Sequence, residues 1–173
     1  ESDYQSASSG TRSWTLDFGS DGTRTVQAVF RDLAGNETQV TDSIILDTQA
    51  PSVTSFSING GASETASAAV TLDSSVSDGT SGVAEARFRE DGSAWSDWTT
   101  YSNSVSWTLS GGEGSHTVEA EFRDEAGNIR ENVVDSIRLD IKPTVASMTV
   151  EDYFDGTPDV TDDDMVKVVS DGA

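Results

Sequence analysis

Acidic side chains are the residues of this sequence that are best suited to chemistry. The 173 residues include 31 Asp and Glu against 10 Lys and Arg, with one histidine and no cysteine. Carboxylate and amide oxygens suit hard cations such as calcium. The absence of cysteine argues against a disulfide-stapled domain. The formal net charge of −21 argues against nucleic acid and anionic membrane surfaces as partners, because contacts to phosphate need Lys and Arg.

One seven-residue phrase with such side chains occurs twice, as FRDLAGN at 30–36 and as FRDEAGN at 122–128. Strand patterns flank both copies, so each should form the hairpin between the last two strands of a sandwich. The carboxylates can accept backbone N–H groups, Gly35 and Gly127 can supply a positive φ, and the asparagines tolerate left-handed geometry. The alternative to this structural interpretation is calcium ligation. The candidate ligands are Asp32, Asn36, Asp124 and Asn128.

Two further acidic segments are candidates for cation binding. The run EDYFDGTPDVTDDD at 151–164 lacks the ligand order of an EF-hand loop, and such runs are more often solvated loops. Asp78 begins the DGTSG loop and is a further candidate. The aspartates of the run are Asp152, Asp155, Asp159, Asp162, Asp163 and Asp164.

Three aromatic residues lie close together in WSDWTTY, namely Trp95, Trp98 and Tyr101. Arginine stacks on aromatic faces, so Arg87 and Arg89 of the preceding strand are expected to sandwich these rings. The functional alternative is a flat platform for carbohydrate. The segment SDY at 2–4 repeats this element with tyrosine in place of the second tryptophan, which favours the structural interpretation.

Catalytic chemistry finds little support in the sequence. His116 is expected to face outward by strand parity, and no nucleophile motif lies near it. The sequence contains no G-x-S-x-G, P-loop or zinc-ligand spacing, so we predict that the chain is not an enzyme. No stretch reaches the roughly 20 apolar residues of a membrane span. The NET sequon at 36–38 is absent from the second copy and is interpreted as accidental.

The elements that must position these residues follow from an internal repeat. Residues 13–51 align with 106–143, and 51–79 resemble 143–173. The sequence therefore predicts the C-terminal half of one repeat at 1–50, a complete repeat at 51–142, and the N-terminal part of a third at 143–173. We expect insertions to fall in loops and the sequence to be a segment of a longer chain.

Period-two alternation predicts the strands of the complete repeat. In HTVEAEFRD, Val118, Ala120 and Phe122 share one face. In VAEARFRE, Ala84, Ala86 and Phe88 should point inward, with Glu85, Arg87 and Arg89 outward. About seven short strands separated by Gly, Asn and Asp turns predict an all-β fold of antiparallel immunoglobulin-like sandwiches.

The pattern WSDW…SWTL…FRD.AGN…DSI.LD…P resembles the tandem immunoglobulin-like repeats of bacterial and archaeal cell-surface proteins, including adhesins, surface layers and filaments. The resemblance covers essentially the whole chain and implies an extracellular, surface-exposed structural protein. It also implies that acidic residues at domain junctions bind calcium and stiffen the chain. The matching positions are Asp47 in LDTQAP and Asp140 in LDIKP.

The resemblance predicts a rigid spacer or the body of a filament or surface layer. Expected partners are neighbouring repeats and other copies of the chain, with no nucleic acid and no membrane insertion. Two alternatives stay open. One is an adhesin or carbohydrate-binding module, and the other is an accessory domain of a secreted hydrolase.

Overall fold

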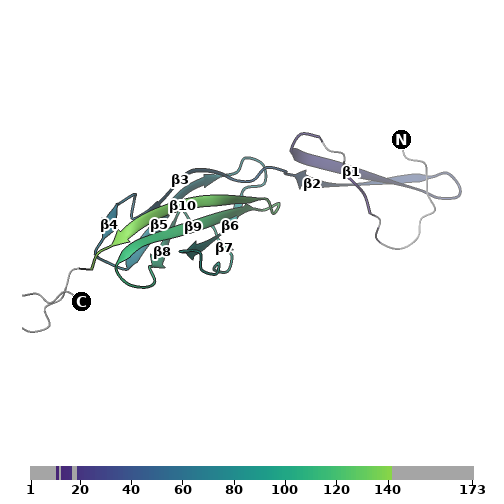
Figure 1. Ribbon diagram of the computed structural model, residues 1–173. Helices are drawn as coiled ribbons and strands as arrows, with labels where there is room; N and C mark the ends of the chain where they lie inside the picture. Colours follow the sequence, from purple (N-terminus) through teal and green to yellow (C-terminus); the bar gives the residue numbers. More distant parts are fainter. Residues whose placement is uncertain (1–10, 12, 17–18, 142–173) are drawn as a thin grey trace, which may run out of the picture. The chain divides into compact units, whose positions relative to one another are not determined.

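The computed structural model describes residue 11, residues 13–16 and residues 19–141 (Figure 1). The chain divides into two compact units, Glu1–Lys142 and Pro143–Ala173, and every described residue belongs to the first. The acidic run 151–164 and the SDY segment at 2–4 lie outside the described residues. Within the described part, no helix is long and apolar enough to cross a membrane.

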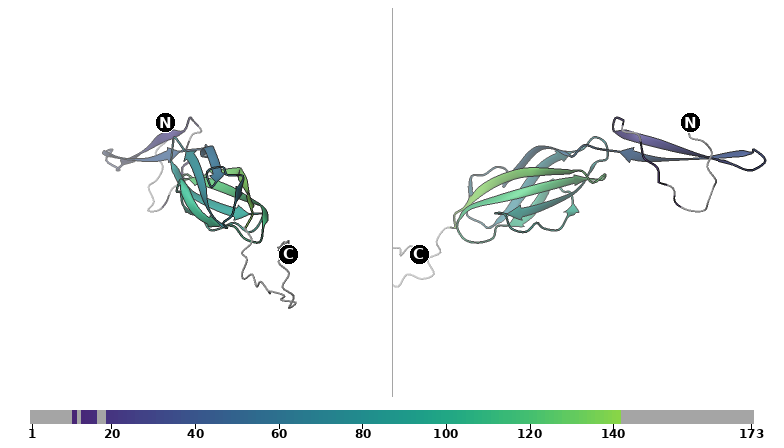
Figure 2. Two further views of the ribbon diagram at one scale, coloured as in Figure 1. Left: turned by 90° about the vertical axis from the view of Figure 1, so that its left-hand side faces the viewer. Right: turned by 45° about the vertical axis from the view of Figure 1, so that its right-hand side comes forward.

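The described strands form a hairpin and a β-sandwich (Figures 1 and 2). The hairpin pairs β1 with β2. One layer of the sandwich has the order β4-β10-β9-β6-β7 and the other the order β3-β5-β8. The strands are β1 (Gly22–Arg31), β2 (Glu37–Leu46), β3 (Ser52–Ile58), β4 (Glu64–Thr65), β5 (Ala69–Ser77), β6 (Val83–Glu90), β7 (Thr99–Thr100), β8 (Ser104–Thr108), β9 (Gly114–Asp124) and β10 (Ile129–Leu139).

This architecture confirms the all-β, antiparallel sandwich that strand alternation predicted. The sandwich has eight strands, where the sequence predicted about seven. Two of them, β4 and β7, are only two residues long, which is too short for an alternating pattern to reveal. One pairing differs from the prediction, since β4 runs parallel to β10. The chain passes through β4 between β3 and β5, so it crosses briefly to the edge of the opposite layer before returning.

The core lies between the two layers and is built around aromatic rings. Phe88 of β6 stands near the centre, with ring centroids 6.4 Å from Phe56, 6.1 Å from Trp107 and 6.5 Å from Phe122. The first contact is stacked, the second tilted and the third edge-to-face, and such contacts add to the burial of apolar area. The predicted inward positions are confirmed for Ala86, Phe88 and the alternate residues of β9, which are buried, whereas Ala84 is only half-buried, beside a register irregularity between Val83 and Glu85.

The β1–β2 hairpin reproduces the β9–β10 hairpin in register. Phe30 pairs with Thr38 as Phe122 pairs with Arg130. β10 carries one extra residue, which forms a bulge between Arg130 and Val133 with Asn132 at φ +60°. The expectation that insertions fall in loops is therefore wrong here, because a β-bulge accommodates an extra residue within a strand.

The two hairpins differ in what covers their apolar faces. Phe122 is 0 % exposed beneath the second layer, whereas Phe30, at the same position of the first hairpin, is 50 % exposed. Val40 and Ile44 are likewise exposed, while their counterparts Val133 and Ile137 are buried. Among the described residues, only the second hairpin has a partner layer.

Candidate functional site

Three carboxylates from separate elements meet at one end of the sandwich. Asp47 follows β2, Asp78 lies in the loop between β5 and β6, and Asp124 ends β9. One oxygen of each lies within 4.8 Å of the others. Asp47 and Asp124 are only 7 % and 2 % exposed. We call these three residues the junction cluster.

The repeated phrase explains the position of Asp124. Its Oδ1 accepts the backbone N–H of Asn128 at 2.8 Å, and its Oδ2 accepts the side-chain amide of Asn128 at 2.8 Å. Gly127 has φ +96°, as predicted for this turn. Asn128 itself has no positive φ, so its expected left-handed role is wrong. It closes the turn through its side chain instead.

Asp78 is fixed by its own loop. Its Oδ1 accepts the backbone N–H groups of Thr80, Ser81 and Gly82 at 2.9–3.0 Å. The hydrogen bond from Gly82 is the largest cause of a lowered pKa for Asp78, against the opposing effect of burial. These donors favour the ionised form of the carboxyl group, so Asp78 presents a negative charge to the other two carboxylates.

Asp47 connects the end of β2 to the sandwich. Its Oδ2 accepts the N–H of Ser81 at 3.1 Å and the hydroxyl of Ser81 at 2.5 Å, and its Oδ1 accepts the N–H of Gln49 at 3.0 Å. The side-chain amide of Asn128 also donates to the carbonyl of Asp47 at 3.1 Å. The segment between β2 and β3 is thereby held to both neighbouring loops.

This arrangement suits a hard divalent cation. A carboxylate offers about four lone-pair sites, and the hydrogen bonds above use only some of them. The donors to these carboxylates are backbone N–H groups, a hydroxyl and an amide, all of them neutral. Calcium accepts several carboxylate and carbonyl oxygens in flexible geometry, so it fits this donor set.

The structure assembles part of the predicted calcium set. Asp47, Asp124 and Asn128 come together, joined by Asp78. Asp32 and Asn36 form the same turn in the first hairpin, with the same two hydrogen bonds at 2.8 Å. Asp140 is exposed, 3.7 Å from Arg138. Sequence reasoning missed Ser81, because no local pattern marks a serine that reaches a carboxylate 34 residues earlier.

A second cluster covers the outer face of β6 and β9. The register places opposite charges directly across from one another. Cross-strand pairs of this kind stabilise sheets. The ion pairs are Glu85–Arg123, Arg87–Glu121 at 2.6 Å and Arg89–Glu119 at 2.6 Å.

The two tryptophans lie on these guanidinium groups. Arg87 is 5.0 Å from the ring centre of Trp95 and 4.5 Å from that of Trp98. Arg89 stacks on Trp95 and Arg123 on Trp98, each at 4.5 Å. The predicted stacking of arginine on Trp95 and Trp98 is therefore confirmed. We call these five side chains and their acidic partners the Arg–Trp ladder.

Tyr101 belongs to the core rather than to the ladder. Its ring meets Phe122 edge to face at 5.9 Å. Its hydroxyl accepts the N–H of Val76 at 3.2 Å and donates to the carbonyl of Ser74 at 3.3 Å. The segment WSDWTTY thus supplies two rings to the outside of the sheet and one to the inside.

We expect Tyr101→Phe to lower the free energy of unfolding by about 1 kcal/mol, because it removes only the hydroxyl that links the residue after β7 to β5. Urea unfolding followed by circular dichroism would measure the change. No measurable difference from the wild type would show that the hydroxyl contributes nothing net.

The outward orientation expected for His116 is wrong. The ring is 5 % exposed and lies on the same side of β9 as Val118 and Ala120. It is paired with Glu90, which is also buried. Parity in fact places His116 on the inward face, two residues before Val118. A buried imidazole is tolerated there because its nitrogens are hydrogen-bonded, and its partner Glu90 lies 26 residues away in the sequence.

Comparisons with known proteins give structural neighbours only. No family model matches the sequence, and no curated protein matches it. The chain is similar to the PKD1 domain of Vibrio anguillarum Epp, with 16 % identity and a TM-score of 0.42 over 56 % of this chain and 100 % of that one. It is also similar to the fibronectin(III)-like modules of Clostridium thermocellum CbhA, with 16 % identity and a TM-score of 0.42 over 80 % of this chain and 72 % of theirs.

Proposed function

We propose that this chain is a structural segment of an extracellular tandem-repeat protein, where it acts as a rigid spacer or as the body of a filament or surface layer. Calcium at the junction cluster restrains the connection between successive repeats. The observation that carries this proposal is the position of Asp47. It belongs to the segment that leaves β2, yet its carboxylate lies beside Asp78 and Asp124 of the following sandwich.

The charge of the cluster supports a cation there. Three carboxylates within 4.8 Å repel one another when ionised, and a divalent cation converts that repulsion into attraction. Because two ligands come from sandwich loops and one from the preceding segment, bound calcium would oppose separation of these elements. Localisation at the cell surface follows from the resemblance to surface repeats and belongs to the same proposal.

We prefer this function to carbohydrate binding at WSDWTTY. Trp95 and Trp98 stack on arginines of their own sheet, and Tyr101 is directed into the core. A sugar platform needs aromatic faces that are free to receive a ring. The use of these side chains in the sheet therefore supports a structural role for the segment.

Calcium should raise the melting temperature of the full chain, and a chelator should lower it. A ligand that binds only the native state stabilises it by about 2.7 kcal/mol at about 100 times its Kd. Melting curves recorded with calcium, with magnesium and with chelator would measure the effect. A melting temperature that is the same in all three would remove calcium from the proposal.

The chain contains a matched control for this experiment. Asp124→Asn and Asp32→Asn weaken the same turn, since both carboxylates hold an asparagine through identical bonds. Only Asp124 belongs to the junction cluster. The calcium response should therefore be lost in Asp124→Asn and kept in Asp32→Asn. Equal responses would place calcium elsewhere.

A further inference from the structure

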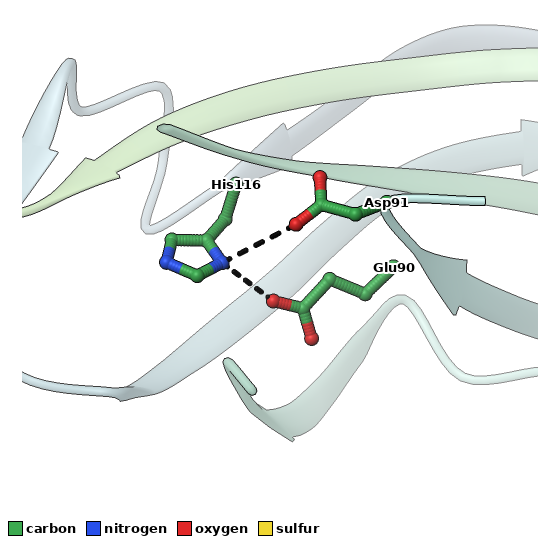
Figure 3. A group of neighbouring side chains, drawn as sticks. All are labelled: Glu90, Asp91 and His116. Atoms are coloured by element: carbon green, nitrogen blue, oxygen red, sulfur yellow. Dashed lines mark hydrogen bonds and ion pairs between the residues drawn. The ribbon is translucent and has the colours of Figure 1, made fainter. Parts of the chain in front are cut away.

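The buried histidine has acceptors at both ring nitrogens. Nδ1 lies 2.7 Å from Oε1 of Glu90 and 3.5 Å from Oδ2 of Asp91, and Figure 3 shows both carboxylates directed at this nitrogen. Nε2 lies 2.9 Å from the carbonyl oxygen of Gly112. A carboxylate and a carbonyl can only accept. An imidazole that bonds to both must donate from both nitrogens, which only the protonated ring can do.

These contacts hold a loop as well as a side chain. The 109–113 loop connects β8 to β9. Glu90 accepts the backbone N–H of Ser110 with both carboxylate oxygens, at 3.0 and 2.9 Å. The His116 ring bonds to the carbonyl oxygen of Gly112 through Nε2. The pair of Glu90 and His116 therefore binds this loop at two points. A neutral imidazole has only one N–H. Either the Glu90 carboxylate or the Gly112 carbonyl would then face the lone pair of the unprotonated ring nitrogen.

The first hairpin provides independent support for a cation at this position. Arg24 precedes Val26 as His116 precedes Val118, and its guanidinium donates to the carbonyl of Ser20. Ser20 lies four residues before Arg24, as Gly112 lies four residues before His116. The same loop carbonyl is thus capped by a permanent cation in one copy and by a titratable one in the other.

We propose that His116 is a proton-dependent lock on the 109–113 loop, closed when the ring is protonated and loosened when it is neutral. This inference does not depend on the proposed function. The 2.7 Å separation of Nδ1 from the Glu90 oxygen lies in the range of a charge-assisted hydrogen bond, as expected for a protonated ring that donates to the carboxylate.

The lock lies where the chain leaves the sandwich. The register pairs Gly114 with Leu139, so the loop is beside the end of β10. In the first copy the corresponding loop contacts the connecting segment directly, because the hydroxyl of Thr48 donates to Asp21 at 3.0 Å. A loop that loosens with pH would therefore act beside the end of β10.

The surrounding charges favour the protonated ring. Three acidic residues lie near the ring: Glu90 at the end of β6, Asp91 in the turn after it, and the exposed Glu113 in the loop itself. From β10, the residue opposite His116 in register is the uncharged Ile137. The pKa of His116 is raised above its ordinary 6.5, chiefly by the hydrogen bond to Gly112 and also by Glu90, against the effect of burial. The stabilisation is therefore complete below about pH 6.5 and is lost as pH rises through the higher pKa of the folded state.

A nuclear magnetic resonance titration of the full chain in chelator tests the lock directly, because the sequence contains a single histidine. We expect both ring nitrogens to show the imidazolium state at neutral pH, with a midpoint above the ordinary value. The amide proton of Ser110 should shift with the same midpoint. A midpoint at or below about 6.5, or a Ser110 signal that does not follow it, would overturn the proposal.

Two variants test the consequence for stability. His116→Arg copies the first hairpin and should melt at nearly the same temperature at about pH 6 and about pH 9, while the wild type should melt at a lower temperature at about pH 9 than at about pH 6. His116→Gln should melt below the wild type at the acidic end and vary little with pH. If His116→Arg kept the pH profile of the wild type, the profile would come from another group and the proposal would fail.

Discussion

Phe122→Ala should lower the free energy of unfolding by about 3–5 kcal/mol, whereas Phe30→Ala, at the same position of the repeated phrase, should cost about 1 kcal/mol or less. The two residues share a sequence context and a strand register. They differ in burial, because Phe122 is 0 % exposed and Phe30 is 50 % exposed. The comparison therefore separates the effect of the second layer from that of the local sequence.

The large cost at Phe122 follows from its neighbours. Its ring contacts Phe88 and Tyr101 edge to face, and truncation would leave a cavity between the layers. Urea unfolding followed by circular dichroism and tryptophan fluorescence would measure both variants. Equal costs would mean that Phe30 is also buried in solution, so that some other part of the chain or another copy covers the first hairpin.

Strand alternation predicted the sandwich well because its strands have one buried and one solvated face. The outward assignment of Glu85, Arg87 and Arg89 needed only local parity and holds throughout β6. The hairpin turn was also predictable, since Asp, Gly and Asn stand at fixed offsets within one short phrase. These features depend on residues that are close in sequence.

The errors concern partners that are distant in sequence. Alternation places His116 inward with Val118, but it cannot show that Glu90 lies beside the ring, so the polar side chain was wrongly assigned outward. The bulge at Asn132 is similar, because only the pairing with β9 shows that β10 carries the extra residue. In the junction cluster, Asp124 and Asp78 were candidates from their local phrases and Asp47 from the resemblance, but their meeting depends on three separate elements that no local pattern relates.

The Arg–Trp ladder gives the second large expected effect. Arg87→Ala should lower the free energy of unfolding by about 2 kcal/mol, and Arg89→Ala should lower it less. Arg87 lies over both Trp95 and Trp98, whereas Arg89 lies over Trp95 alone. Near-ultraviolet circular dichroism and urea unfolding would report the packing of the indoles and the stability together.

The difference between the two variants arises mainly from the carboxylates that they leave behind. The side chain of Glu121, the partner of Arg87, is 10 % exposed, and that of Glu119, the partner of Arg89, is 29 % exposed. A buried carboxylate without its cation carries a desolvation cost that solvent relieves at the more exposed site. Arg87→Ala combined with Glu121→Gln should therefore recover part of the loss. If the double variant were no more stable than Arg87→Ala, the loss would come from the indole stacking and not from the unpaired charge.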